Sequence, residues 1–462
     1  MMNVAAIRHA ELLATFDAPE GGAGREITDG AVLVEGNRIA WVGPDSALEA
    51  EIARRKQRPA WEIDARHHLV IPGLVNTHHH FYQTLTRNLP AGQDAELFDW
   101  LVAHYPVWAR MDREALQASS QVAAAELMLS GCTTASDHTY LWPNDTRVDD
   151  QIEAVSELGL RFHCSRGSMS VGESAGGLPP DRVVEREDAI LADTRRVIEA
   201  YHDGSDYAMT RIVVAPCSPF SVSPTLMRES AELARSYGVH LHTHLAETRD
   251  EEAYCLQTLG ATPVGFAEAV NWTGDDVWFA HMVHPRKEEI SRLGEAHCGV
   301  AHCPSSNMRL GSGIAPVAEM HRAGMRVGIG VDGSASNDTS NMITEARQAL
   351  LLRRLSRDME TSARRVLWYA TRGGASVLGR KEIGRIAPGA AADIVGFRLD
   401  SLAMAGGAVH DPLAALLFCS SPSVSFSCIN GVLRVADGEL VGVDLPGLIS
   451  RHNRAAINLI EG

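Results

Sequence analysis

The sequence lacks the features that mark secreted and membrane-bound proteins. Its eight cysteines are scattered and form no Cys-x-x-Cys pair, so we expect reduced thiols rather than a disulfide framework. Arg8, His9 and Glu11 interrupt the N-terminal apolar stretch and leave no signal-peptide core. No run approaches the roughly 18 consecutive apolar residues of a membrane span. These absences predict a cytoplasmic protein without a membrane partner.

Basic residues are also fewer than acidic residues. The 42 Lys and Arg residues stand against 58 Asp and Glu residues, which gives a formal net charge of −16. Nucleic acids bind to a basic face, so we expect no nucleic-acid partner. The 45% hydrophobic and 22% charged residues are typical of a globular protein with ample material for a core. Twenty histidines are the unusual feature of this composition.

The two ends of the chain read as β structure. Two apolar runs flank Gly36-Asn37, which is typical of a hairpin turn. Near the C-terminus, Asn430-Gly431 and Asp437-Gly438 are turn dipeptides of the same kind. This pattern predicts a small, discontinuous β-sandwich domain formed by residues 1–69 and 383–462.

The middle of the chain, residues 70–382, alternates short β-branched runs with helical stretches. Such alternation predicts an α/β fold with a parallel sheet, and eight strands in about 300 residues favour a (β/α)8 TIM barrel over a doubly wound sheet. The candidate strands lie at 68–77, 132–138, 160–165, 211–218, 239–244, 277–281, 299–303 and 325–332. Candidate helices between them lie at 113–130, 184–201, 225–237 and 342–355.

Titratable residues gather at the C-terminal ends of these candidate strands. A TIM barrel carries its active site at this edge, so the side chains should converge there. The strand-end residues are His78, His79, His80, Asp137, His138, His244, His281, His302 and Asp332, with Glu247 just beyond His244.

Four of these residues form a candidate metal site. His78 and His80 are two apart on a strand and face one side, whereas His79 faces the other. With His244 and Asp332 they provide three nitrogens and one oxygen, a set that suits Zn²⁺ and also Fe²⁺ and leaves a position for water. The competing interpretation of any single buried histidine is a hydrogen-bonded core residue. Convergence of several strand ends favours the metal.

Two alternative sites are disfavoured by the sequence. A binuclear metal centre would need a bridging lysine or carboxylate near the end of the fourth strand, but that segment reads Ala-Pro-Cys-Ser at 215–218. We therefore expect one divalent metal per chain. Gly328, Gly330 and Gly333 spell G-x-G-x-x-G, but a basic segment lies about 20 residues beyond, where a dinucleotide site needs a carboxylate.

Several motifs together resemble the cytosine deaminase-like branch of the amidohydrolase superfamily over essentially the whole chain. These are PGLVNTHHH, HLHTHLAET, FAHMVHP, AHCPSSNMRLGSGIAPV and GVDGSASND. Within that branch, HHHFYQTLTRNLP, SDHTYLWP, APCSPFSVSP and HDPLAALLFCSSP are most similar to 8-oxoguanine deaminases, with hydroxyatrazine and isoxanthopterin hydrolases as neighbours. The resemblance implies a metal-dependent hydrolase of small heterocycles, and it leaves a homo-oligomer open.

The resemblance also implies catalytic roles. Asp332 would take a proton from the metal-activated water, and His281 would orient or polarise that water. Glu247 would protonate a ring nitrogen and then pass a proton to the departing ammonia. Many relatives carry histidine where Cys217 stands, so direct substrate contact from this position is in doubt, and a small buried thiol is expected.

Substrate contacts are predicted from side-chain chemistry near the strand ends. Gln83 offers an amide that can pair with a lactam or guanidine edge, and Arg166 could hold a carbonyl oxygen. The full predicted substrate-binding set is Gln83, Arg166, Tyr140, Trp108, His302 and Asn307. His79, His138 and His284 are expected to be structural.

The favoured reaction is hydrolysis of 8-oxoguanine to urate and ammonia. The same machinery could act on guanine, on isoxanthopterin or on an s-triazine that loses an alkylamine. A barrel that binds a ligand without catalysis would be favoured if a metal ligand were missing, but all four are present in the sequence.

Overall fold

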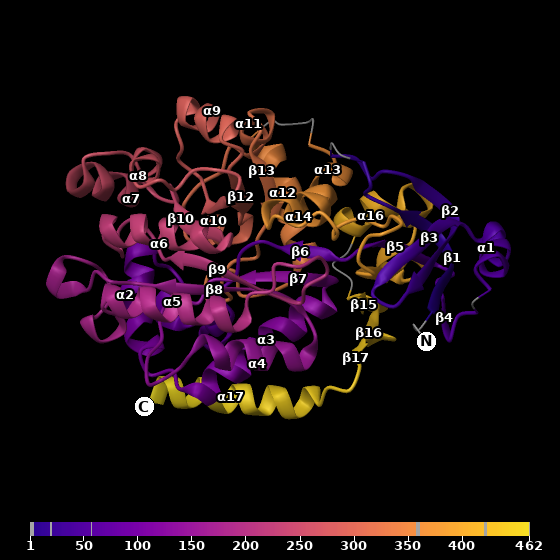
Figure 1. The fold of residues 1–462 in the computed structure, drawn as a ribbon, viewed down its shortest axis with the longest axis horizontal. Helices are drawn as coiled ribbons and strands as arrows, with labels where there is room; N and C mark the ends of the chain where they lie inside the picture. Colours follow the sequence, from indigo (N-terminus) through magenta and orange to yellow (C-terminus); the bar gives the residue numbers. More distant parts are fainter. Residues whose placement is uncertain (1–3, 19–20, 57, 357–360, 420–422, 462) are drawn as a thin grey trace.

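The computed structural model describes residues 4–18, 21–56, 58–356, 361–419 and 423–461. A closed barrel of eight parallel strands stands beside a separate nine-stranded sheet that joins the two ends of the chain (Figure 1). The predicted TIM barrel with a β unit from both termini is therefore confirmed. The barrel strands are β6 (Leu74–Asn76), β7 (Cys132–Asp137), β8 (Arg161–Ser168), β9 (Thr210–Pro216), β10 (His240–Leu245), β11 (Val277–His281), β12 (Gly299–His302) and β13 (Arg326–Ile329).

Helices cover the outside of the barrel, and three of those predicted begin at a polar capping residue. The side chains of Asp112, Ser223 and Asn341 each accept a backbone N–H three residues ahead, which satisfies a donor in the first helical turn. The predicted helices are observed as α3 (Arg113–Leu129), α5 (Glu187–Tyr201), α6 (Pro224–Tyr237) and α12 (Met342–Leu355).

The other helices are shorter or lie in the connections. They are α1 (Leu48–Arg55), α2 (Leu97–Trp108), α4 (Val148–Leu158), α7 (Arg249–Tyr254), α8 (Pro263–Ala269), α9 (Lys287–Glu295), α10 (Pro304–Arg309), α11 (Val317–Arg322), α13 (Ala363–Trp368), α14 (Gly374–Val377), α15 (Gly407–His410), α16 (Pro412–Phe418) and α17 (Leu445–Glu461). Among the described helices, none has the length and apolar character needed to cross a bilayer.

The stretch expected to form one strand over 68–77 divides between the two sheets at Gly73. β5 (His68–Pro72) pairs with the terminal sheet, whereas β6 belongs to the barrel. A Cβ at Gly73 would lie 2.0 Å from Thr133 Oγ1, so only glycine fits where the chain passes between the sheets. β5 and β6 are both buried throughout, so the sequence pattern gives no sign of this division.

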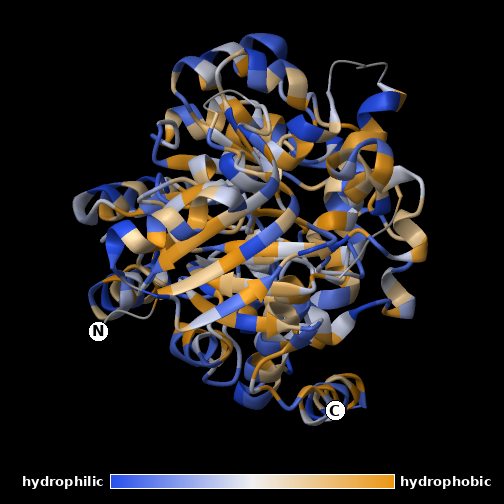
Figure 2. Ribbon diagram, turned by 90° about the vertical axis from the view of Figure 1, so that its right-hand side faces the viewer, coloured by the Kyte–Doolittle hydropathy of each residue, from blue (hydrophilic) through white to orange (hydrophobic). Residues whose placement is uncertain are grey.

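The terminal sheet runs in the order β17-β16-β15-β14-β5-β1-β2-β3, with β4 paired to β1. Figure 2 faces this sheet and shows hydrophobic runs along its strands. The predicted turns at Gly36-Asn37 and Asn430-Gly431 join β2 to β3 and β15 to β16. Its other strands are β1 (Val4–Ala14), β2 (Glu26–Glu35), β3 (Arg38–Pro44), β4 (Trp61–Asp64), β14 (Ile394–Arg398), β15 (Phe426–Ile429), β16 (Val432–Ala436) and β17 (Glu439–Leu440).

A buried ion pair fastens the barrel to the terminal sheet. The guanidinium of Arg161, at the start of β8, contacts both carboxylate oxygens of Asp393, with Nη2–Oδ1 at 3.0 Å and Nε–Oδ2 at 3.2 Å. Both side chains are at most 1% exposed. Asp393 also accepts the backbone N–H of Asn430 at 2.6 Å. Each group is therefore costly to leave without its partner.

The C-terminal helix α17 lies along α3 on the outside of the barrel (Figure 1). His452 Nε2 lies 3.0 Å from Thr84 Oγ1 in the short helical segment η2 (Phe81–Thr86), which directly follows the strand-end histidines. Arg110 donates to the carbonyls of Leu459 and Ile460 and so satisfies the end of α17. The last helix thereby braces a segment next to the barrel mouth.

We predict that Asp393→Asn destabilises the fold by about 3–5 kcal/mol, because the Arg161 charge stays buried without a carboxylate. Asp400→Asn, which removes the exposed partner of Arg398, should leave the free energy of unfolding almost unchanged. Urea-induced unfolding of both variants measures the difference. Equal losses would show that the buried pair does not fasten the two sheets.

Candidate metal and catalytic centre

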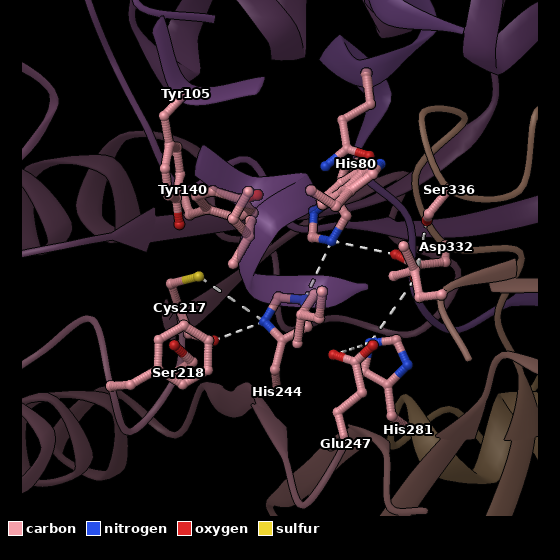
Figure 3. A pocket seen from close by; sticks show the side chains of 16 residues that line it. His80, Tyr105, Tyr140, Cys217, Ser218, His244, Glu247, His281, Asp332 and Ser336 are labelled. Atoms are coloured by element: carbon pink, nitrogen blue, oxygen red, sulfur yellow. Dashed lines mark hydrogen bonds and ion pairs between the residues drawn. The ribbon is translucent and has the colours of Figure 1, made fainter. Parts of the chain in front are cut away.

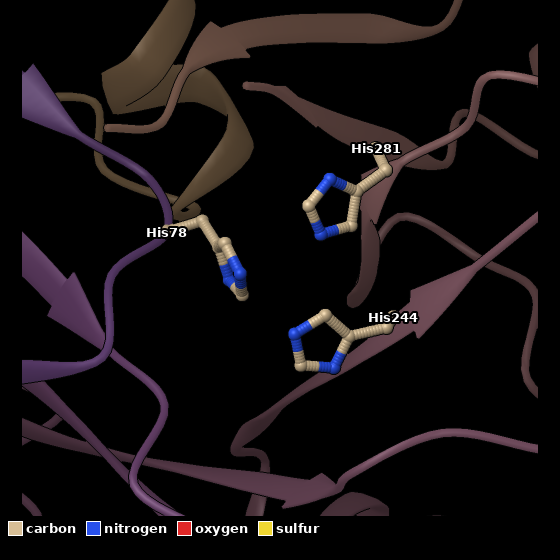
Figure 4. A group of neighbouring side chains, drawn as sticks. All are labelled: His78, His244 and His281. Carbon is tan, nitrogen blue, oxygen red and sulfur yellow. The ribbon is translucent and has the colours of Figure 1, made fainter. Parts of the chain in front are cut away.

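The structure brings the four predicted metal ligands together at the mouth of the barrel. Asp332 Oδ1 lies 3.2 Å from His78 Nε2 and 3.2 Å from His80 Nε2. His80 Nε2 lies 3.1 Å from His244 Nε2. His281 joins the group, and Figure 4 shows its ring, with those of His78 and His244, turned toward one centre. His244 and His281 lie on β10 and β11, whereas His78, His80 and Asp332 lie just beyond the ends of β6 and β13. The sequence pattern places His78 and His80 near a strand end, but the strand itself stops at Asn76.

Backbone carbonyls set the orientation of two of these rings. His80 Nδ1–H donates to the carbonyl of His138 at 2.6 Å, and His244 Nδ1–H donates to the carbonyl of Cys217 at 2.6 Å. Since Nδ1 carries the proton in both rings, each Nε2 turns its lone pair toward the centre.

The ring of His78 is set by a second histidine. His242 Nδ1–H donates to the carbonyl of Trp278 at 2.9 Å, so His242 Nε2 accepts the Nδ1–H of His78 at 2.7 Å. Sequence reasoning missed His242. The signal was the alternation of histidines at 240, 242 and 244 in one strand, which puts all three side chains on one face.

This arrangement fits a divalent cation. Three Nε2 lone pairs and a carboxylate oxygen face one another at close to 3 Å, and such acceptors repel unless a cation lies between them. Within the described residues, buried His78 Nε2 has no hydrogen-bond partner. Burial and the neighbouring His80 lower the pKa of His244 to about 3, which keeps this ring neutral. Neutral imidazoles with one carboxylate are a donor set typical of zinc and iron sites.

Glu247 and His281 lie beside this donor set (Figure 3). Glu247 Oε2 is 3.5 Å from His281 Nε2, and Glu247 Oε1 accepts from Ser312 Oγ at 3.3 Å. Burial raises the pKa of Glu247 above its ordinary value. Burial lowers the pKa of His281, but the carboxylates of Glu247 and Asp332 raise it by more. Glu247 is thus suited to carry a proton near neutral pH.

The backbone is strained where these side chains leave their strands. Ala246, His281, Met282 and Asp332 all have positive φ, between 48° and 72°. Side chains other than glycine rarely adopt this conformation, which costs of order 1–3 kcal/mol per residue. The strain aims His281 and Asp332 into the barrel mouth.

A cavity opens over the centre and is lined by Gln83 and Tyr140, both predicted substrate contacts. Gln83 Oε1 is buried without a hydrogen-bond partner among the described residues. A Cβ at Gly333 would lie 1.8 Å from Gln83 Oε1, so glycine makes room for the amide. An unpaired buried acceptor at a cavity wall is available to a ligand.

Four other predicted substrate contacts lie outside the cavity lining. Arg166 is held by Glu185 and Asp193, each at 2.7 Å, so its charge is already paired. Trp108 packs edge-on behind Tyr82 with ring centroids 5.3 Å apart.

The remaining two residues support the site or stand behind it. Asn307 Oδ1 accepts the Nδ1–H of His281 at 2.9 Å and thereby positions that ring. His302 is fully enclosed at the end of β12, and burial lowers its pKa to about 3. Direct contact with a substrate is not supported by the positions of these four residues.

Sequence reasoning foresaw half of the residues that line the cavity. Cys217 does line it, as a thiol whose pKa burial raises to about 12, with Sγ 3.9 Å from His244 Nδ1. The unforeseen residues come mainly from α2 and from loops, where apolar and hydroxyl side chains give no distinct signal. They are Leu97, Trp100, Leu101, Tyr105, Ser218, Phe220, Leu310 and Ser336.

Comparison with known proteins agrees with this geometry. The chain is 51% identical to 8-oxoguanine deaminase of Pseudomonas aeruginosa over 440 residues, which cover 94% of this chain and 95% of the relative. It is 37% identical to an isoxanthopterin deaminase of an unknown prokaryotic organism, with 95% of each chain covered. The crystal structure of atrazine chlorohydrolase from Arthrobacter aurescens TC1 complexed with zinc matches with a TM-score of 0.90 at 33% identity, covering 98% of this chain and 100% of that one.

Family models place the chain more broadly. Residues 30–51 match an imidazolonepropionase-like composite domain of bacteria. Residues 69–431 match the amidohydrolase family. This range spans the whole barrel and, from the terminal sheet, β14, β15 and nearly all of β5. Together with the strand-end histidines and Asp332, these matches confirm the resemblance found in the sequence: the chain belongs to the amidohydrolase family.

Proposed function

We propose that this enzyme is a metal-dependent hydrolytic deaminase that converts 8-oxoguanine and water to urate and ammonia. The observation that carries the reaction class is the cluster of histidines and Asp332 with the buried Glu247 beside it. The deaminase relatives support the same chemistry.

His78, His80, His244 and Asp332 would hold one divalent cation. When bound, the cation acts as a Lewis acid and lowers the pKa of a coordinated water toward about 7. We favour Zn²⁺, because the related atrazine chlorohydrolase was crystallised with zinc. Fe²⁺ suits the same donors.

The residues of this chain divide the proton transfers between them. Asp332 Oδ2, on the side toward His281 at 3.8 Å, can take a proton from the attacking water. Glu247, whose raised pKa favours the protonated form, would donate its proton to a ring nitrogen during attack. It would then take the proton of the newly added hydroxyl group and pass it to the leaving amine, and the proton held by Asp332 would return to Glu247. His281, held by Asn307, orients the water between these two carboxylates.

Gln83 and the cavity over the centre support an oxopurine as substrate. The Gln83 amide can donate and accept toward a lactam edge, and its carbonyl has no other partner among the described residues. The relative at 51% identity acts on 8-oxoguanine according to its name. Isoxanthopterin, guanine and s-triazines that lose an alkylamine are the alternative substrates.

A substrate panel tests this proposal directly. We expect the highest kcat/KM with 8-oxoguanine when release of ammonia or alkylamine is measured from oxopurines, pteridines and aminotriazines. A higher value for another heterocycle would replace the substrate but keep the reaction. No release from any compound by metal-loaded protein would refute the deaminase.

Glu247→Gln should lower kcat by about 10²–10⁴-fold, because the amide occupies the same space but cannot transfer a proton. Metal content, measured by mass spectrometry, should stay at the wild-type level, since Glu247 is not a ligand. Glu288→Gln, at an exposed position of α9, is the matched control and should retain full activity. Full activity of Glu247→Gln would exclude Glu247 as the proton carrier.

His242→Phe should weaken zinc affinity about 10–100-fold, because His78 then loses the acceptor that orients its ring. Competition with a chromophoric chelator measures this affinity. The exposed His410→Phe serves as the control. Unchanged affinity in His242→Phe would mean that the His78–His242 contact does not prepare the site.

A further inference from the structure

The cavity has two ends with different chemistry. Figure 3 shows Asp332 and His281 on one side and Tyr105, Tyr140 and Cys217 on the other. The cavity also has an apolar wall, to which α2 contributes leucine and tryptophan side chains. This apolar lining consists of Leu97, Trp100, Leu101, Phe220 and Leu310.

Among the hydroxyl groups at this far end, that of Tyr105 stands out. The Tyr140 hydroxyl interacts with that of Tyr82, and Ser218 Oγ lies 2.8 Å from Ser221 Oγ. Tyr105 Oη is buried and has no hydrogen-bond partner among the described residues. The side chain is 1% exposed and packs edge-on against Trp108, with ring centroids 5.9 Å apart.

An unpaired buried hydroxyl is unfavourable, and a bound ligand that brings an acceptor removes this cost. Tyr105 keeps its proton, because burial raises the pKa of its phenol well above 10. The nearby Cys217 thiol is only a weak donor. Tyr105 is therefore the strong donor that this end of the cavity presents to a substrate.

We propose that Tyr105 Oη donates a hydrogen bond to an oxo group on the substrate edge opposite the leaving amine, and so selects 8-oxopurines over purines without that oxygen. The inference rests on the proposed function and deepens it. In 8-oxoguanine the amino-bearing carbon and the 8-oxo carbon lie at opposite ends of a fused bicycle. Placing the amino group beside Glu247 carries the 8-oxo oxygen toward the far wall.

The test compares two competitive inhibitors: urate, the deamination product of 8-oxoguanine, and xanthine, the deamination product of guanine. Urate carries the 8-oxo oxygen, and xanthine carries a C–H at that place. In Tyr105→Phe we expect the inhibition constant for urate to rise at least tenfold and that for xanthine to change less than twofold. The kcat/KM for 8-oxoguanine should fall in parallel with urate binding. The ratio of the inhibition constants for urate and xanthine does not depend on the fraction of active enzyme in the preparation.

A second test variant and a matched control complete the experiment. Tyr105→Leu also removes the hydroxyl and should show the same selective loss, which keeps the test available if the phenylalanine variant folds poorly. Tyr237→Phe, at a partly exposed position of α6, is the matched control and should leave both inhibition constants unchanged.

The outcomes separate this inference from the proposed function. Equal weakening of urate and xanthine in Tyr105→Phe, or no weakening of either, would overturn the role of Tyr105 while wild-type deamination of 8-oxoguanine stands. Wild-type protein that does not deaminate 8-oxoguanine would refute the proposed substrate and this inference with it.

Discussion

The structure depends on one electrostatic constraint: several hydrogen-bond acceptors face each other at the barrel mouth. The Nε2 lone pairs of His78, His80 and His244 and the carboxylate of Asp332 lie within hydrogen-bond distance of their neighbours, yet the protons of these rings are committed elsewhere. Only a cation between them makes the arrangement favourable. The carbonyls of barrel strands, directly or through His242, hold the rings in this state.

The same strand ends that gather the proposed metal ligands also position Glu247 and His281. β10 supplies His244 and leads into Glu247, and β11 ends at His281, whose backbone is strained. Stored strain of this kind persists only because the surrounding barrel is closely packed. The buried Arg161–Asp393 pair and the contact of α17 with η2 hold the surrounding elements together and so help to fix the positions of the site residues.

Residues at or just beyond the strand ends were predictable from the sequence, whereas the cavity residues of α2 were not. Period-two alternation places His78 and His80 on one side of a strand, and barrel topology brings His244 and Asp332 to them. By contrast, Tyr105 and Trp108 both lie in α2, and nothing in their spacing says which one reaches the cavity. Arg166 lies near the C-terminal end of β8, but its carboxylate partners come from α5 and the segment before it, a contact that only tertiary structure reveals.

The most direct measurement is the metal content of the purified full-length enzyme, combined with X-ray absorption at the edge of the metal found. Facing acceptors at the barrel mouth predict about one divalent ion per chain, with the scattering pattern of imidazole ligands. Catalytically active protein that stays free of metal after exhaustive chelation would contradict this explanation of the site, as would an ion bound without imidazole.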